Sequence, residues 1–155
     1  MPEPLLRSAT DADVDGITRL VEAAFGKYVE RIGKLPAPMT ADYANLLATS
    51  RIWVLDDGDG LAGVLVTKAE PDHLLLDVVA VAPTAQGSGH GRTLLDRADR
   101  DAREQGLAEI RLCTNEAMTE NLEFYPRRGF HETSRGLQDG YRRVFFAKSL
   151  ATSRT

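Results

Sequence analysis

The sequence predicts a mixed α/β (α+β) fold in which roughly seven strands form one sheet and about four helices cover its two faces. Two patterns predict it. Short apolar runs separated by tight turns dominate the first half of the chain, which is typical of β-hairpins. In the second half apolar runs alternate with amphipathic stretches, which is typical of βαβ units, so we expect parallel and antiparallel strands in one sheet. The 155 residues are predicted to form a single domain over residues 1–150, with a frayed tail at residues 151–155.

Helices are predicted where apolar residues recur every three or four positions. The clearest pattern runs from Val14 to Phe25, with Thr10 or Asp11 as its cap and Gly26 as its end. The other predicted helices span residues 40–47, capped by Thr40, residues 91–106 and residues 120–125.

Strands are predicted where short apolar runs are bounded by turn-forming residues. The predicted strands span residues 5–7, 51–55, 61–68, 73–81, 109–113, 130–134 and 141–148. Asp-Gly pairs within residues 56–60 predict a hairpin between the second and third strands. Trp53 and Cys113 lie in apolar strands and are expected to pack in the core. No element is predicted from Tyr28 to Met39, because prolines there restrict the residues before them to extended conformations.

The composition excludes several classes of protein. The chain has 19 Lys and Arg against 23 Asp and Glu, a net charge of −4, and no basic stripe, so we expect no nucleic-acid partner. Its apolar stretches are far shorter than the roughly 20 residues that cross a bilayer, so we expect no membrane partner. The N-terminus lacks a basic start followed by an apolar core, so we expect no signal peptide and a cytoplasmic location. The single cysteine excludes an intramolecular disulfide, and no histidine belongs to an HExxH motif, so no metal is expected.

The most informative stretch, residues 78–92, consists of an apolar strand, a proline, a glycine-rich loop and a helix start. Glycines let the backbone approach a ligand closely, and the first amides of a helix attract phosphate. A ligand with a pyrophosphate therefore fits. The spacing departs from both common nucleotide motifs. Arg92 and Gln86 stand where a Walker loop needs lysine and its first glycine, and Gly87-x-Gly89-x-Gly91 is GxGxG rather than GxGxxG.

Gln86-x-x-Gly89-x-Gly91 resembles the acetyl-CoA signature [QR]-x-x-G-x-[GA] of the GNAT superfamily of N-acetyltransferases. In that family the signature also lies between an apolar strand and a long helix. A second match, Asn121-x-x-Phe124-Tyr125 followed by Gly129-Phe130, resembles the family's terminal N-x-x-F-Y-x-x-x-G-F element. The order of strands and helices fits over essentially the whole chain. The resemblance implies a mostly antiparallel seven-stranded sheet with helices on both faces.

The resemblance also implies acetyl-CoA as cofactor and CoA as product. In the family the strand before the loop splays away from the next strand, and pantetheine lies in the gap and pairs with the strand backbone. The cofactor-binding residues implied here are Val79, Ala80, Val81, Gln86, Gly87, Ser88, Gly89, His90, Gly91, Arg92 and Asn121.

The chemistry implied by the resemblance is direct acetyl transfer to a primary amine. Tyr125 matches the family's tyrosine near the sulfur, and an ordinary tyrosine pKa of about 10 suits a neutral donor, although Pro126 interrupts the helix directly after it. Asp77 interrupts an apolar strand and is the candidate base, acting directly or through water; alternatively it pairs with an arginine. Alternation places Asp77 on the same face as Val79 and Val81, whose amides could stabilise the oxyanion.

The acceptor is predicted to bind between the first two long helices, in a segment that varies among members of the family. The candidate substrate-binding residues are Tyr28, Glu30, Arg31, Met39 and Tyr43. Glu30 could hold an ammonium and Arg31 a carboxylate, whereas Tyr28 and Met39 could instead pack against the sheet. The expected partner is a small-molecule or peptide amine, and a homodimer is compatible with the family.

Two alternatives stay open. One is a non-catalytic CoA-binding or regulatory domain on the same fold. The other, outside the family, is an α/β domain that binds nucleotide phosphates through the glycine-rich loop.

Overall fold

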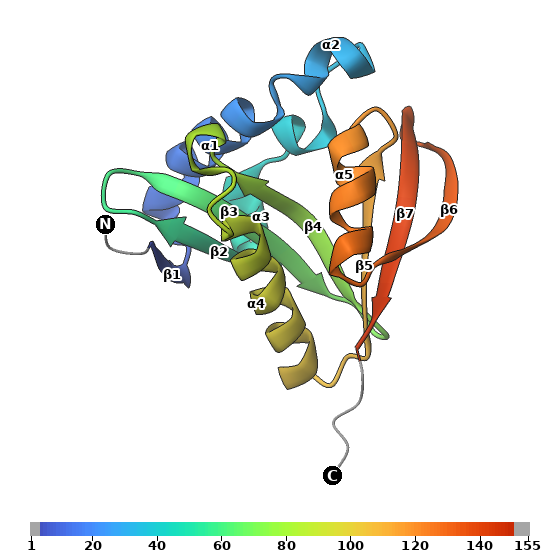
Figure 1. Cartoon of the computed structure of the whole chain (residues 1–155). Helices are drawn as coiled ribbons and strands as arrows, with labels where there is room; N and C mark the ends of the chain where they lie inside the picture. Colours follow the sequence, from blue (N-terminus) through green and yellow to red (C-terminus); the bar gives the residue numbers. More distant parts are fainter. Residues whose placement is uncertain (1–3, 151–155) are drawn as a thin grey trace.

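The computed structural model describes residues 4–150 (Figure 1). Within them, seven strands form one sheet in the order β1-β2-β3-β4-β5-β7-β6; β4 and β5 are parallel and the other neighbours antiparallel. The strands are β1 (Leu5–Ser8), β2 (Arg51–Asp56), β3 (Leu61–Ala69), β4 (Leu74–Val81), β5 (Glu109–Asn115), β6 (His131–Gln138) and β7 (Tyr141–Ser149). The α-helices are α1 (Val14–Phe25), α2 (Tyr28–Ile32), α3 (Tyr43–Thr49), α4 (His90–Glu104) and α5 (Thr119–Phe124). The predicted mixed, mostly antiparallel sheet is confirmed, while the predicted tail at residues 151–155 lies outside the described residues.

The helix α1 follows its apolar periodicity. Every third or fourth side chain from Ile17 to Phe25 is buried, and the helix ends at Gly26 as predicted. The additional helix α2 lies in the segment for which the sequence predicts no element, and it ends at Gly33, whose φ of 86° is left-handed. Across residues 4–150, every helix is too short or too polar to cross a membrane.

The helix α3 begins three residues later than predicted. Its cap is Asp42, whose carboxylate accepts the backbone amide of Asn45 (3.1 Å). The hydroxyl of the predicted cap, Thr40, instead donates to the carbonyl of Ala37 (2.8 Å) within a separate 3-10 turn.

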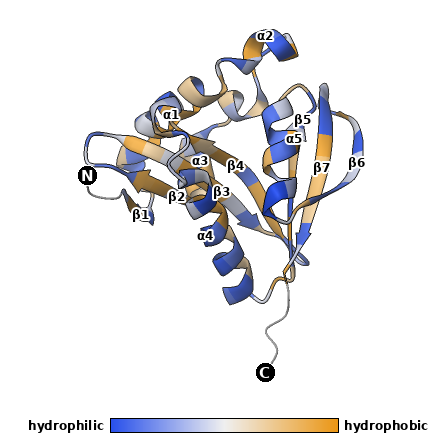
Figure 2. Ribbon diagram, in the orientation of Figure 1, coloured by the Kyte–Doolittle hydropathy of each residue, from blue (hydrophilic) through white to orange (hydrophobic). Residues whose placement is uncertain are grey.

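Alternating side chains of the central strands build a separate core on each face of the sheet. Trp53 and Leu65 belong to the core that includes α4, whereas Val54 and Val66 belong to the core that includes α1 and α3. Figure 2 shows the hydrophobic residues concentrated in the strands and many hydrophilic residues on α4. The predicted core position of Trp53 is confirmed, and its indole N–H donates to the buried carboxylate of Asp101 (2.8 Å).

Strand β4 contains a β-bulge halfway along its length. Val66 on β3 pairs with Val78, but the next residue, Thr67, pairs with Leu76, so Asp77 is an extra residue without a partner on β3. The bulge reverses the alternation: Leu76 lies in the core with α4, whereas Val78 lies in the core with α1.

The bulge also decides which way Asp77 faces. Burial raises the pKa of the Tyr43 phenol in the core with α1, and the Asp77 carboxylate lies close enough to raise it further. Val79 and Val81 pack against the opposite core. The prediction that Asp77 shares a face with these two valines is therefore wrong, because strict alternation does not hold across a bulge.

Strands β4 and β5 separate soon after they begin. Within residues 4–150 they pair at Leu74–Ile110 and Leu75–Arg111 alone. From there β5 stays paired with β7 up to Asn115, while β4 continues to Val81 without a partner on this side. The gap implied by the family resemblance is therefore present, and it positions the site.

Candidate functional site

Two adjoining cavities lie along the gap between β4 and β5. The larger, ≈ 610 Å³, is formed by the end of β4, the loop that follows it, the start of α4 and α5. The smaller, ≈ 160 Å³, lies between β4, β5 and the segment that joins α2 to α3. Both are lined by Phe25, Val79, Asn121 and Tyr125, so they meet at these four side chains.

The backbone of β4 is open to a ligand on the edge that faces the gap. The amide of Ala82 donates to Ala62 on β3 (2.9 Å). Because successive amides of a strand point to alternate edges, those of Val81 and Val79 point toward the gap. The Val81 carbonyl on this edge accepts the side-chain amide of Gln86 (3.3 Å), which ties the loop to the end of the strand. The three strand residues predicted to bind the cofactor all line the larger cavity.

The loop after β4 offers backbone amides to an anion. Gly87 and Gly89 have φ of 88° and 84°, a conformation that residues with side chains rarely adopt. Gly89 is the N-cap of α4 and brings no capping side chain, so the first amides of this 15-residue helix stay free for a phosphate. Gly91 instead permits close packing, because a Cβ there would lie 3.1 Å from the ring of Phe124.

The predicted loop residues, with one exception, line the larger cavity. The exception is Ser88, whose hydroxyl donates to the carbonyl of Ala85 (2.7 Å) and so stabilises the turn. His90 and Arg92 add positive or polar groups at the start of the helix.

Two basic residues that the sequence analysis missed also line the larger cavity, Lys27 and Arg128. The Arg128 guanidinium lies over the ring of Phe124 (4.1 Å to the centroid). Its buried Nε has no hydrogen-bond partner among the described residues. A buried unpaired donor is unfavourable, and a phosphate oxygen would satisfy it. The signal in the sequence is the pair Arg127-Arg128, which stands inside the second family motif, between Tyr125 and Gly129.

Tyr125 lies where the two cavities meet, among the rings of Phe124, Phe130 and Phe146 (centroids at 5.2, 5.6 and 6.0 Å). Within residues 4–150 its hydroxyl has no hydrogen-bond partner. Burial raises the pKa of Tyr125 above its ordinary value, so the hydroxyl is neutral at pH 7. Pro126 does not remove Tyr125 from the cavities. The helix α5 ends at Phe124, one residue before Tyr125, and Pro126 starts a separate 3-10 turn.

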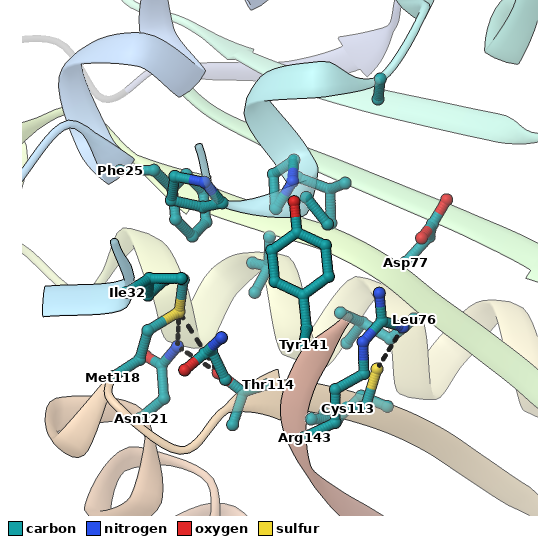
Figure 3. Close-up of a pocket in the computed structure, with 18 of the residues that line it drawn as sticks. Phe25, Ile32, Leu76, Asp77, Cys113, Thr114, Met118, Asn121, Tyr141 and Arg143 are labelled. Atoms are coloured by element: carbon teal, nitrogen blue, oxygen red, sulfur yellow. Dashed lines mark hydrogen bonds between the residues drawn. The ribbon is translucent and has the colours of Figure 1, made fainter. Parts of the chain in front are cut away.

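Asn121 is held on the cavity wall by two neighbours (Figure 3). Its side-chain amide donates to the hydroxyl of Thr114 (3.0 Å), and that hydroxyl donates to the sulfur of Met118 (3.4 Å). Thr114 and Met118 are buried, so the amide group has a fixed position beside Tyr125.

The smaller cavity is mostly apolar, and among its described lining residues Asp77 and Arg143 are the two that carry charge (Figure 3). Asp77 is exposed to solvent as a residue, yet protein atoms crowd its carboxyl group on the cavity side. This burial raises the pKa of Asp77 above its ordinary value, although the positive charges of Arg143 and Lys68 partly oppose the shift. A carboxylate with a raised pKa accepts a proton more readily than an exposed one.

Cys113 lies on the wall of the smaller cavity rather than in the core, where it was expected. Its sulfur accepts an N–H from Arg143 (3.5 Å). Burial raises the pKa of the Cys113 thiol, which keeps it protonated at neutral pH and weakens it as a nucleophile.

The segment predicted to bind the acceptor does wall the smaller cavity, but through residues other than those predicted. The lining residues from this segment are Ile32, Pro36, Ala37, Pro38 and Ala41. Of the five predicted residues, Tyr28 lines the larger cavity. Glu30 is exposed, and Met39 packs against the core with α1. Arg31 pairs with Glu120 (2.7 Å). Tyr43 is buried and donates to the carbonyl of Pro38 (2.7 Å). A role for any of the five in binding the acceptor stays a prediction.

Solved structures of acetyltransferases share this fold. A GNAT-family acetyltransferase from Staphylococcus aureus matches with a TM-score of 0.78 and 15% identity, covering 95% of this chain and 99% of that one. The ribosomal-protein-S18-alanine N-acetyltransferase from Escherichia coli matches with 0.76 and 18%, covering 97% and 96%. A GNAT-family acetyltransferase from Elizabethkingia anophelis with acetyl-CoA bound matches with 0.67 and 15%, covering 94% and 97%. At these identities the likeness shows the fold alone. No curated protein sequence matches this chain at a significant level.

The comparison with protein families adds to this. The model of the acetyltransferase (GNAT) domain matches residues 48–132, which is more than half of the chain. The matched part contains β4, the glycine-rich loop, α4 and Tyr125. The chain therefore belongs to the GNAT acetyltransferase family.

Proposed function

We propose that this protein, as a single domain over residues 1–150, is an acetyl-CoA-dependent N-acetyltransferase that transfers the acetyl group directly to a primary amine. The observation that carries the proposal is the free edge of β4, which connects the uncapped start of α4 to a second cavity. Tyr125 lies between the two cavities. An extended molecule with phosphates at one end, amides along its length and a thioester at the other end fits this arrangement.

Acetyl-CoA would supply an acetyl group activated as a thioester. The amides of Gly87–Arg92 would hold the pyrophosphate, together with Arg128, whose buried Nε lacks a protein partner among the described residues. Val79 and Val81 would pair with the pantetheine amides through the backbone groups on the open edge of β4. Lys27 and Arg92 contribute further positive charge near the phosphates.

The side chains at the junction suit a direct transfer. Asp77, with its raised pKa, takes a proton from the ammonium group of the acceptor, directly or through one water. The neutral amine nitrogen forms the new N–C bond and the C–S bond breaks, while the Val79 amide stabilises the negative charge on the carbonyl oxygen. Tyr125 donates its proton to the departing sulfur and recovers one from the nitrogen. The products are an N-acetylated amine and the free thiol.

Thermal unfolding and thiol release together test the proposal. We expect acetyl-CoA and CoA to raise the unfolding temperature, because both bind the native state, and ATP to raise it less. We expect thiol release from acetyl-CoA to depend on an added amine, and mass spectrometry to find the acetyl group on nitrogen. The amine panel covers amino acids, polyamines, aminoglycosides and peptides with free N-termini.

The same measurements separate the alternatives. Stabilisation by CoA without amine-dependent thiol release from any member of the panel would favour a non-catalytic CoA-binding domain. Stabilisation by ATP but not by CoA would favour a domain that binds nucleotide phosphates.

A further inference from the structure

The smaller cavity has a rim that joins two distant parts of the chain. The ammonium of Lys34 donates to the carbonyl of Gly140 (2.6 Å) and lies over the ring of Tyr141 (4.0 Å to the centroid). The hydroxyl of Tyr141 donates to the carbonyl of Leu35 (2.7 Å). The segment after α2 is thereby connected to the turn between β6 and β7. A cavity of ≈ 160 Å³ behind this rim admits a small molecule.

The charges in the cavity are balanced. Asp77 projects from β4 and Arg143 from β7, and in Figure 3 both lie on the same side of the Tyr141 ring. They form no ion pair with each other within the described residues, yet Arg143 is near enough to oppose in part the rise that burial causes in the pKa of the Asp77 carboxyl. Each charge is therefore available to a ligand that carries the opposite one.

The side chain of Arg143 has N–H donors that form no hydrogen bond with the described residues. One terminal nitrogen, Nη1, donates to the side-chain oxygen of Gln138 (2.9 Å) and to the sulfur of Cys113 (3.5 Å). These contacts and the ring of Tyr141, whose centroid lies 5.5 Å from the guanidinium carbon, hold the guanidinium at the cavity wall, whereas Nη2 and Nε have no hydrogen-bond partner among residues 4–150. A planar fork of free N–H groups suits a carboxylate, which it can bind through two parallel hydrogen bonds.

These observations favour an acceptor with two charges over one that is purely cationic. A polyamine would bring positive charge against Arg143 and leave that guanidinium unpaired. A small molecule with an ammonium and a carboxylate would pair with both side chains. The apolar walls, which include Phe25, Ile32 and Leu112, would contact the rest of it.

Resting on the proposed function, we infer that the acceptor is a small amine that also carries an anionic group, an amino acid in the first place, and that Arg143 binds this anion and so determines acceptor specificity. The ammonium group then lies beside Asp77, two residues from the Val79 amide.

Paired acceptors test this inference. Leucine, methionine and phenylalanine are each compared with their amides and their decarboxylated amines. They are also compared with the matching aminophosphonates, and this comparison shows whether the site takes only a carboxylate or any small anion. We expect kcat/KM for the amino acids to exceed that for the amides and decarboxylated amines, which carry the ammonium group but no anion, by about 10- to 100-fold, as for a hydrogen bond to a charged group. In Arg143→Gln the preference disappears, mainly through KM, and Arg143→Lys restores part of it. The matched control is Arg142→Gln on the same strand, whose arginine is exposed and does not line the cavity.

A binding measurement separates this inference from the proposed function. The same pairs are titrated by calorimetry into the protein saturated with CoA. Tighter binding of the amino acids, lost in Arg143→Gln, supports the inference even where thiol release is absent, and absent release then contradicts the transferase proposal alone. Equal binding and equal turnover of acceptors with and without the carboxylate, or a preference unchanged in Arg143→Gln, would overturn the inference while acetyl transfer stands.

Discussion

Tyr125 combines an aromatic environment with an unbonded hydroxyl, and the two have different consequences. The ring packs against three phenylalanines and contributes to stability, whereas the hydroxyl makes no hydrogen bond within residues 4–150. The hydroxyl reaches the cavities and bonds to no protein group among the described residues, so the fold alone gives no reason for it. A ligand atom at the junction of the cavities does.

Tyr125→Phe separates these two contributions. We expect kcat to fall by about 100-fold or more, because a general acid at the leaving group is lost. The free energy of unfolding should change by less than about 1 kcal/mol, because the hydroxyl has no protein partner to lose. Steady-state thiol release and urea unfolding measure the two effects. Unchanged affinity for acetyl-CoA serves as the control, and wild-type turnover in the variant would exclude Tyr125 as the acid.

Asp77→Asn tests the base through its pH dependence. In the wild type kcat/KM should rise with pH through a pKa above the ordinary aspartate value, because the ionised carboxylate takes the proton. In the variant this rise of kcat/KM with pH should be absent. A carboxyl whose pKa is raised in the folded state opposes folding once the pH exceeds that pKa, so the variant should be at least as stable at pH 7. This difference should shrink as the pH falls through the raised pKa of Asp77, and it should vanish below the ordinary aspartate pKa. Loss of stability in Asp77→Asn at pH 7 would mean that the carboxylate is structural.

The candidate residues differ in how far the sequence can reveal them. Asn121, Tyr125 and the loop glycines belong to contiguous motifs, so their spacing alone predicts a shared site. Arg143 belongs to none of the motifs identified, and Arg128 occupies a position at which the second motif specifies no residue. They reach the cavities because the 3-10 turn Pro126–Arg128 and strand β7 lie beside the cavities in space, which residue spacing does not encode.

At the scale of elements, strand alternation predicts side-chain direction until a bulge interrupts it. Trp53 on β2 and Leu65 on β3 face the same core because both strands are regular there. On β4 the extra residue at Asp77 reverses the pattern. The sequence marks the place with an aspartate in an apolar run, but an unpaired residue and a polar position in a regular strand look the same in one dimension.

The glycine-rich loop leads to a prediction about backbone conformation. Gly89→Ala forces a side chain into a φ of 84° at the start of α4. This should cost about 1–2 kcal/mol of unfolding free energy and weaken acetyl-CoA binding, because the first amides of the helix change direction. Gly60→Ala is the matched control, since Gly60 lies in a turn, has open space around it and has no positive φ. Urea unfolding and calorimetric titration measure both effects, and equal losses in the two variants would contradict the role of φ.

At the scale of the whole molecule, the sheet consists of two parts that meet weakly at the site. The strands β1 to β4 form one part and β5 to β7 the other, and two residue pairs connect them at the start of β4. The fold class and the splay follow from the order of elements and the family resemblance. The shape of the smaller cavity does not, because it depends on contacts such as Tyr141 with Leu35, which are 106 residues apart.

Glu120 connects the two parts above the gap. From α5 it pairs with Arg31 (2.7 Å) and with Lys27 (3.4 Å), which belong to α2 and the residues before it. These charges lower the pKa of Glu120 from 4.5 to about 2. The pairs are exposed, so their contribution to global stability is small. Their effect should instead be local, on how freely the two sides of the larger cavity separate.

Glu120→Gln tests this connection. A carboxyl with a lowered pKa stabilises the fold at pH values above its unfolded pKa, and this contribution disappears as the pH falls toward about 2. The wild type should therefore be slightly more stable than the variant at pH 7, by at most about 1 kcal/mol, and the difference should vanish in acid or in high salt. Hydrogen exchange of α2 and α5 amides should be faster in the variant at pH 7, because local opening no longer breaks two ion pairs. Glu123→Gln on the same helix, where the glutamate is exposed and in no ion pair among the described residues, is the control. A stability difference that persists at pH 2, or equal exchange in all three proteins, would show that the two parts are held together by packing alone.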